Sequence, residues 1–238
     1  MLKTYKKIVR FSNRTRSRFK KPLYIISYPK TGRTWLRYIL GNYFCQKYQF
    51  STKNILNTEI ICSNIGLAKV SFTHAGWGFP SEKSYKRLKI NQALFDKGKV
   101  AILSRNLKDI MVSSYMHVKF RNKDPQLNNL NMDDFLASEI YGVMKPLTFY
   151  SQLNEYSKKA TDTLNITYEN LHIDPLNTIK SILTWIGEKN IDESILKSSI
   201  ESAAFEKMKK VEKENLSNSN RLKATDLSNN ESFKCREG

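Results

Sequence analysis

Residues 22–40 read PLYIISYPKTGRTWLRYIL, and this stretch decides the fold. A short apolar run, Leu23 to Ile26, is followed by turn-forming residues, Ser27 to Gly32. The apolar residues beyond the turn recur at helical spacing: Trp35, Leu36, Ile39 and Leu40. The pattern predicts a buried strand, a tight turn and a helix, which is the repeating unit of α/β proteins.

The turn itself is a candidate anion-binding loop. Gly32 allows the backbone to approach a ligand closely, and the N-terminus of the following helix presents N–H groups to a phosphate. Lys30 adds a positive charge, and Thr31 and Thr34 add hydroxyls. Because Lys30 precedes the glycine, the spacing departs from the Walker pattern G-x-x-x-x-G-K-[ST] of ATP and GTP sites. A strand-to-helix turn whose lysine simply faces water is the structural alternative.

A second strand-to-helix junction carries another cation. Residues 100–103 are apolar and predict a buried strand, and Asn106 can begin a helix. Arg105 lies at the joint, where its guanidinium can bind a phosphate with two hydrogen bonds, and Ser113 supplies a hydroxyl two turns into the helix. The alternative is an arginine that caps the sheet and a serine that contacts nothing.

A histidine follows the strand predicted over residues 67–73. Ligands collect at the carboxyl ends of strands in an open parallel sheet, so His74 is placed for chemistry. An imidazole with its ordinary pKa of about 6.5 can accept a proton from a hydroxyl near neutral pH. A surface or capping histidine is the alternative.

These segments resemble the PAPS-dependent sulfotransferases, whose sulfuryl donor is 3′-phosphoadenosine 5′-phosphosulfate (PAPS). Residues 28–36, YPKTGRTWL, resemble the family's 5′-phosphosulfate loop, YPKSGTTW or PKSGRTW. Arg105 and Ser113 have the spacing of the family's 3′-phosphate motif, R-x-P-x-D-x-x-x-S, with Leu107 in place of the proline. His74 matches the histidine that serves as the family's catalytic base. Phe72 stands where the family has a lysine, two residues before that histidine.

The resemblance covers residues 22–208 and returns at 233–238. Tyr168 matches a tyrosine near the adenine. Residues 204–208, AFEKM, are similar to the SFExM box, in which the residues matching Phe205 and Met208 flank the adenine ring. The last residues resemble the family's R-K-G element, which implies that Arg236 and Gly238 grip the 3′-phosphate.

The resemblance implies an α/β fold with a central, mostly parallel sheet flanked by helices, the P-loop NTPase-like sulfotransferase fold. The charge pattern and the extent of the resemblance together predict a basic N-terminal arm over residues 1–21 and a single sulfotransferase domain over residues 22–238. The resemblance also implies an enzyme that transfers the sulfuryl group from PAPS to an acceptor hydroxyl or amine by in-line displacement, without a metal. Lys30 would stabilise the leaving oxygen and His74 would take the acceptor's proton. The implied donor-binding residues are Lys30, Thr31, Gly32, Arg33, Thr34, Trp35, Arg105, Ser113, Tyr168, Phe205, Met208, Arg236 and Gly238.

The positive charge of the chain is unevenly distributed. The net charge is +18, and fourteen lysines and arginines precede the first acidic residue, Glu59. Such charge attracts polyanions, although most of it is expected to be solvated surface. We interpret residues 1–21 as a flexible basic arm, with an amphipathic membrane-surface helix or a transit-like segment as alternatives. No nucleic-acid partner is expected, and a peripheral membrane contact through the arm stays open.

Cysteine usage and hydropathy favour a soluble cytoplasmic protein. Cys45, Cys62 and Cys235 are too few and too scattered for a disulfide framework or a zinc site. No apolar run is long enough to cross a bilayer. At 238 residues the chain suits one α/β domain.

Two functions from other classes remain as alternatives. An atypical nucleotide-dependent kinase would need Mg²⁺ and an acidic residue after a strand, and no convincing one follows the predicted strands. A noncatalytic basic protein would bind nucleic acid or membrane with a steep salt dependence. The acceptor of a sulfotransferase is left open between carbohydrate, lipid, phenol and amine, as is the oligomeric state.

Overall fold

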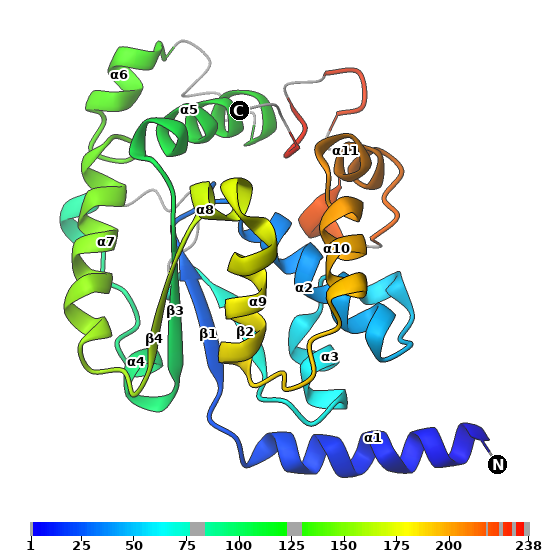
Figure 1. Cartoon of the computed structure of the whole chain (residues 1–238). Helices are drawn as coiled ribbons and strands as arrows, with labels where there is room; N and C mark the ends of the chain where they lie inside the picture. Colours follow the sequence, from blue (N-terminus) through cyan, green and yellow to red (C-terminus); the bar gives the residue numbers. More distant parts are fainter. Residues whose placement is uncertain are drawn as a thin grey trace.

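The computed structural model describes residues 2–76, 84–122, 130–217, 219–223, 226–229 and 232–235. Within these ranges the chain forms a four-stranded sheet in the order β2-β1-β3-β4, and every neighbouring pair is parallel (Figure 1). The strands are β1 (Leu23–Ser27), β2 (Val70–Thr73), β3 (Lys99–Ser104) and β4 (Thr163–Thr167). The predicted fold class is confirmed.

All four strands end at one edge of the sheet. Ile26 of the central strand β1 pairs with Thr73 of β2 and with Ile102 of β3, and Ser104 pairs with Thr167 of β4. Because the strands are parallel, the segments that follow them emerge side by side. The residues that begin these segments are Tyr28, His74, Arg105 and Tyr168.

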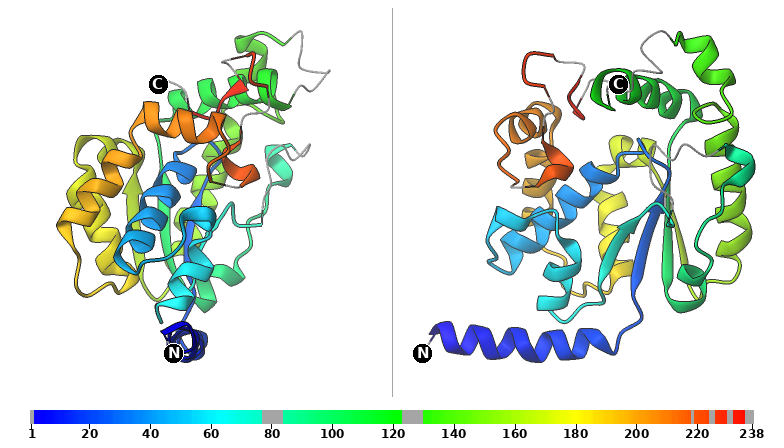
Figure 2. Two further views of the ribbon diagram at one scale, coloured as in Figure 1. Left: turned by 90° about the vertical axis from the view of Figure 1, so that its right-hand side faces the viewer. Right: turned by 180° about the vertical axis from the view of Figure 1, so that it is seen from behind.

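Helices cover both faces of the sheet (Figures 1 and 2). Successive strand side chains point to opposite faces, so Ile25 belongs to one buried cluster and Ile26 to another. The Ile25 face is covered by α2 (Arg33–Lys47), α3 (Thr58–Asn64), α9 (Pro175–Ile186) and α10 (Glu193–Ser202). The Ile26 face is covered by α4 (Ala93–Lys97), α5 (Leu107–His117) and α7 (Met144–Ser157).

Local sequence signals set several helix ends. The Asn106 side chain accepts a hydrogen bond from the Lys108 N–H at 2.9 Å and so caps α5. Pro175 occupies the first turn of α9, and Gly187 ends that helix in the left-handed region with φ 96°. The Asn106 cap confirms the helix that the sequence predicts to begin there.

Two segments differ from the sequence-based expectation. Residues 162–171 alternate between polar and apolar, which predicts a strand over this range. In the structure the strand stops at Thr167, whose hydroxyl accepts from the Asn170 N–H at 3.1 Å and starts α8 (Tyr168–Ile173). The composition of residues 209–231, rich in Lys, Asn, Ser and Glu, predicts a mobile segment. Part of this segment instead completes α11 (Phe205–Lys213) and forms a short 3₁₀ turn (Asn220–Leu222), since Val211 and Leu222 are buried in the core.

Residues 2–18 form a helix, α1 (Leu2–Arg18), which corrects the expectation of a flexible arm. Asn13 donates to the Asn64 carbonyl at 3.0 Å, and the Arg10 guanidinium lies 4.9 Å from the centre of the Phe50 ring. Figure 1 shows α1 at the opposite end of the sheet from α5 and α11. The division into an arm and a domain at residue 22 stays a prediction. Among the helices described, none is long and apolar enough to span a membrane.

From the sequence, four aromatic residues in the helical patterns at 132–141 and 143–157 could be either core residues or acceptor contacts, and in the structure they pack in the core. Phe135, Tyr141 and Phe149 are buried, and the Tyr150 hydroxyl donates to the Leu103 carbonyl at 3.0 Å. The elements around them are α6 (Met132–Ala137), the 3₁₀ turn Tyr85–Arg87 and the π-helical turn Val118–Asn122. A further 3₁₀ turn, Thr52–Asn54, leads into α3.

Candidate active site

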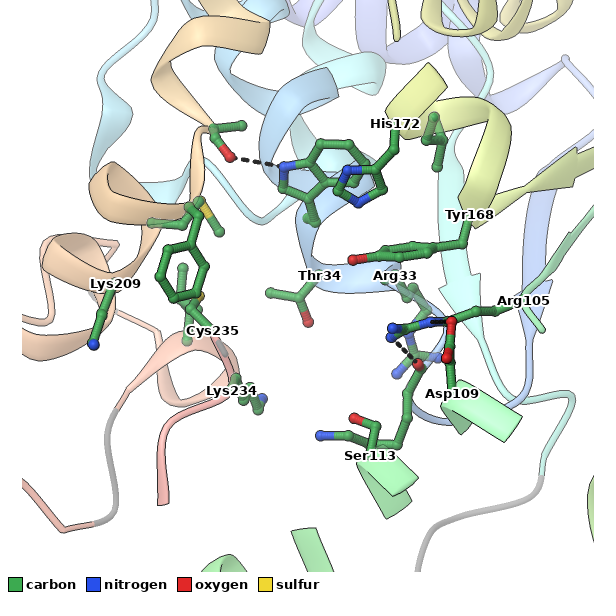
Figure 3. A pocket seen from close by; sticks show the side chains of 18 of the residues that line it. Arg33, Thr34, Arg105, Asp109, Ser113, Tyr168, His172, Lys209, Lys234 and Cys235 are labelled. Carbon is green, nitrogen blue, oxygen red and sulfur yellow. Dashed lines mark hydrogen bonds and ion pairs between the residues drawn. The ribbon is translucent and has the colours of Figure 1, made fainter. Parts of the chain in front are cut away.

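A cavity of about 1310 Å³ opens at the carboxyl edge of the sheet (Figure 3). Every candidate site residue within the described ranges lines this cavity except Thr31. Arg236 and Gly238, the two remaining candidates, lie outside the described residues. Segments as far apart in the chain as Lys30, Arg105 and Met208 therefore meet in one place.

The loop after β1 has the strained backbone of an anion-binding turn. Lys30 has φ 71° and Gly32 has φ 81°, both in the left-handed region. A Cβ atom on Gly32 would lie 2.4 Å from Cδ2 of Tyr168, so this position accepts no side chain. The Thr31 hydroxyl donates to the Tyr28 carbonyl at 2.9 Å and is buried, so it stabilises the turn instead of facing the cavity.

The N-terminus of α2 opens into the cavity. Its first backbone hydrogen bond joins the Leu36 N–H to the Gly32 carbonyl at 3.0 Å, so the preceding amides have no partner within the helix. Those amides belong to Arg33, Thr34 and Trp35, which all line the cavity. The positive end of the helix dipole adds to this local potential for an anion.

Arg105 connects the two candidate phosphate sites. Its guanidinium donates to the Lys30 carbonyl at 3.3 Å, lies 3.6 Å from a carboxylate oxygen of Asp109 and covers the Tyr168 ring at 4.1 Å (Figure 3). Ser113 lines the same side of the cavity from α5. The interactions hold the arginine in one orientation, with part of its donor fork directed toward the cavity.

Aromatic side chains form one wall of the cavity. The rings of Trp35 and His172 are stacked, with centroids 4.5 Å apart, and Tyr168 meets Trp35 edge-on. The Trp35 indole donates to the Ala203 carbonyl at 2.8 Å, which ties this wall to the segment before α11. Phe205 and Met208 line the cavity from α11. A flat heterocycle such as adenine can stack or pack against these surfaces.

His172 is a site residue that the sequence analysis missed. The predicted strand over residues 162–171 placed it beyond the site, whereas α8 sets it one helical turn after Tyr168. Its pKa is lowered by burial and by the charge of Arg105. The signal that could have found it is the Thr167 cap, which starts a helix at Tyr168.

His74 faces the cavity as a neutral base. Its Nδ1 lies 2.7 Å from the Ser27 carbonyl oxygen. A carbonyl can only accept, so Nδ1 carries the proton and Nε2 is left as an acceptor. Burial, followed by the charges of Arg33 and Arg37, lowers the pKa of His74 to about 3.

The segment near the C-terminus is held by one buried carboxylate. Glu212 accepts hydrogen bonds from the backbone N–H groups of Lys234 at 2.8 Å and Cys235 at 3.0 Å, and it pairs with Arg121 at 3.1 Å. Lys234 and Cys235 line the cavity. Burial, with the charge of Arg121, lowers the pKa of Lys234 to about 8, and burial raises the pKa of the Cys235 thiol to about 12.

Comparison with known proteins places the chain in a family. The rat protein Sulfotransferase 1A1 is 27% identical over 199 residues, which cover 79% of this chain and 66% of that protein. The rabbit amine sulfotransferase is 24% identical over 206 residues, covering 82% of this chain and 65% of the relative. The chain thus spans just under two thirds of the length of these relatives.

A solved structure confirms the fold. Retinol dehydratase, crystallised with androsterone and the inactive cofactor PAP, aligns with a TM-score of 0.54 at 15% identity, over 79% of this chain and 66% of that chain. The shared architecture is the P-loop NTPase-like fold of sulfotransferases. The model of the sulfotransferase domain matches residues 20–237, and the chain belongs to the sulfotransferase domain family.

Proposed function

We propose that this protein transfers the sulfuryl group of PAPS to an acceptor hydroxyl or amine. The observation that carries the proposal is the contact between Arg105 and the Lys30 carbonyl, because it brings two phosphate-type strand ends into one cavity. A nucleotide with phosphates at its 3′ and 5′ ends needs two such sites. The rat and rabbit sulfotransferases support the same reaction class by their similarity.

The donor would lie across the cavity between the two sites. Lys30 and the amides at the start of α2 bind the 5′-phosphosulfate, and Arg105 with Ser113 binds the 3′-phosphate. Trp35, Tyr168, Phe205 and Met208 hold the adenine, and His172 extends that stacked wall. Arg236 and Gly238 complete the proposed 3′-phosphate grip.

The proposed transfer step uses His74 in its neutral form. The negative charge of the bound donor would oppose the charges of Arg33 and Arg37, which add to burial in lowering the pKa of His74, and so would make the imidazole a stronger base. His74 accepts the proton of the acceptor hydroxyl at Nε2 while the acceptor oxygen forms its bond to sulfur. The bond between sulfur and the bridging oxygen of the phosphosulfate breaks, and the negative charge stays on that oxygen. Lys30 and the loop amides are already oriented toward this charge, so they stabilise it without reorganisation.

The proposed setting of the reaction is a reducing compartment. Cys45, Cys62 and Cys235 are all thiols in the structure, and the first two are buried. We propose a cytoplasmic enzyme that takes a small-molecule, glycan or lipid acceptor and binds no nucleic acid. The proposal includes a peripheral contact between the basic helix α1 and a membrane surface.

Calorimetry with 3′,5′-bisphosphate adenosine (PAP) tests the donor site. We expect saturable 1:1 binding, and weaker binding by at least about tenfold for 5′-AMP, which lacks the 3′-phosphate. Labelled PAPS with a panel of hydroxyl and amine acceptors then tests transfer. Absence of PAP binding, or equal binding of the two nucleotides, would reject the proposed function.

A further inference from the structure

Arg33, which lines the cavity, belongs to a second group of arginines, apart from Arg105. The other two, Arg37 and Arg221, are not among the residues that line it, and Arg221 is exposed. We call Arg33, Arg37 and Arg221 the arginine group. Arg33 lines the cavity beside His74, and Arg37 follows it by one turn of α2. The Arg37 guanidinium donates to the Phe72 carbonyl at 3.3 Å and covers the Phe72 ring at 4.5 Å, two residues before His74.

The arginine group lacks a matching set of acids. No ion pair joins any of the three to a carboxylate in the part of the chain that the structure describes. Arg37 is 5% exposed, and its Nε is buried without a hydrogen-bond partner there. Burial, with the charges of the neighbouring arginines, lowers the pKa of Arg33 to about 10 and that of Arg37 to about 9. The charge of Glu59 raises the pKa of Arg37, but it is the smallest of the effects on that group. The Glu59 carboxylate also accepts a hydrogen bond from the Ser71 hydroxyl at 2.7 Å.

The two cationic groups act on different sides of the loop after β1. Arg105 covers the Tyr168 ring and, in addition to burial, its charge lowers the pKa of His172; Tyr168 and His172 both follow β4. In addition to burial, the charges of Arg33 and Arg37 lower the pKa of His74, which follows β2. The 3′-phosphate of the proposed donor would bind at the first side, and its 5′-phosphosulfate would bind at the loop between the two sides. The acceptor must approach His74, so it approaches the arginine group.

Uncompensated charge of this kind is stabilised by a bound anion. Burial takes Arg33 and Arg37 out of water beside one another, which raises the free energy of the folded state, and a ligand anion offsets that cost. A guanidinium also selects planar or tetrahedral oxyanions by its donor geometry. With a neutral acceptor, the 5′-phosphosulfate of the donor would be the one ligand anion available to offset this charge.

We propose that the acceptor itself carries an anionic group, a carboxylate or a phosphate, close to the hydroxyl that is sulfurylated. The Arg33 side chain binds the anion, while Arg37 and Arg221 add positive charge from behind it. The hydroxyl then lies at Nε2 of His74. The inference rests on the proposed function and narrows its acceptor from any hydroxyl compound to a hydroxylated acid.

Two matched ligand series test the inference without requiring turnover. The first is 4-hydroxyphenylacetate, tyrosol and tyramine, which present the same phenol with a negative, neutral or positive side group. The second is glucuronate, glucose 6-phosphate and glucose, which separates carboxylate from phosphate. Each ligand is titrated calorimetrically into the protein saturated with PAP, and each is then assayed with labelled PAPS.

We expect the anionic members to bind at least about tenfold more tightly than their neutral counterparts. Arg221→Gln should weaken anion binding about threefold or more and leave the dissociation constant of PAP unchanged. Arg33→Gln should bring the ratio of anionic to neutral binding close to one. Arg18→Gln removes one charge from α1, at the far end of the sheet, and should change neither constant.

The outcomes separate the inference from the proposed function. If PAP binds but no anionic ligand is preferred over its neutral counterpart, the inference is wrong and the donor assignment stands. The inference is also wrong if Arg221→Gln and Arg18→Gln behave alike. If PAP does not bind, both proposals are rejected together.

Discussion

The guanidinium of Arg105 donates a hydrogen bond to the backbone carbonyl of Lys30 at 3.3 Å. The two residues are separated by 75 positions in the chain, and each follows a parallel strand of the sheet. One contact thus joins the candidate phosphosulfate loop to the candidate 3′-phosphate site. In the proposed binding mode, a doubly phosphorylated nucleotide would lie between these two sites.

Lys30→Ala should lower the turnover number by roughly 10² or more, because it removes a cation aimed at the charge that develops on the leaving oxygen. The measurement is initial-rate transfer from labelled PAPS at saturating donor. Lys197→Ala, an exposed position on α10, serves as the matched control. Near-normal turnover in Lys30→Ala would reject the role given to Lys30.

Arg105→Gln should weaken PAP binding more than 5′-AMP binding, since the proposed partner of the lost charge is the 3′-phosphate, which 5′-AMP lacks. A charge-assisted hydrogen bond of about 1.5–3 kcal/mol corresponds to a loss of roughly 10- to 100-fold for PAP. Calorimetric titration of both nucleotides gives the comparison. If both affinities fell by the same factor, Arg105 would act by holding the Lys30 loop and not by reading the 3′-phosphate.

His74→Ala should abolish transfer to hydroxyl acceptors while PAP still binds. The reason is that Nε2 is the proton acceptor in the proposed step, and the donor is held by other residues. Assay with labelled PAPS and calorimetry with PAP measure the two properties separately. Loss of both would show that His74 has a structural role through its bond to Ser27.

Acid should destabilise the folded protein through His74. Its folded pKa of about 3 is below the ordinary value of 6.5, so between these pH values the unfolded chain binds a proton that the folded chain does not. The stabilising contribution is complete above pH 6.5 and is lost as the pH falls toward 3. Urea unfolding at about pH 7 and about pH 5 should show a smaller drop in the free energy of unfolding for His74→Gln than for the unmodified protein. Equal drops would contradict the shifted pKa.

Glu212→Gln should loosen the segment that carries Lys234 and Cys235 against the cavity. The carboxylate is fully buried and pairs with Arg121, and breaking such a pair costs about 3–5 kcal/mol of stability. We expect a lower midpoint of urea unfolding and weaker PAP binding. Glu214→Gln, exposed at the end of the same helix, is the control. Identical PAP affinity in the two variants would show that the segment does not contribute to the nucleotide site.

The junctions at β1 and β3 were predictable because all their signals are local. An apolar strand, a turn with Gly32, and the Asn106 cap each lie within a few residues of the side chain they position. Parallel strands then bring the following segments to one edge, so Lys30, His74 and Arg105 could be expected together before any coordinates. Elements governed by longer-range packing were predicted less well. Helix α11 runs through a mostly polar stretch. Its packing depends on a few buried residues, such as Met208 and Val211, and so few apolar positions give no clear helical pattern in the sequence.

By itself, the sequence determined the parallel α/β sheet and the residues that stand at the ends of its strands, because strand, turn and cap signals act over a few neighbouring positions. Tertiary structure alone decided that Trp35 stacks on His172, that Glu212 holds the backbone of Lys234, and that Arg33 and Arg37 lower the pKa of His74. Each of these depends on side chains from separate segments sharing a buried, poorly hydrated space. Burial of that kind follows from how the helices pack on the sheet, and no local pattern in the chain encodes it.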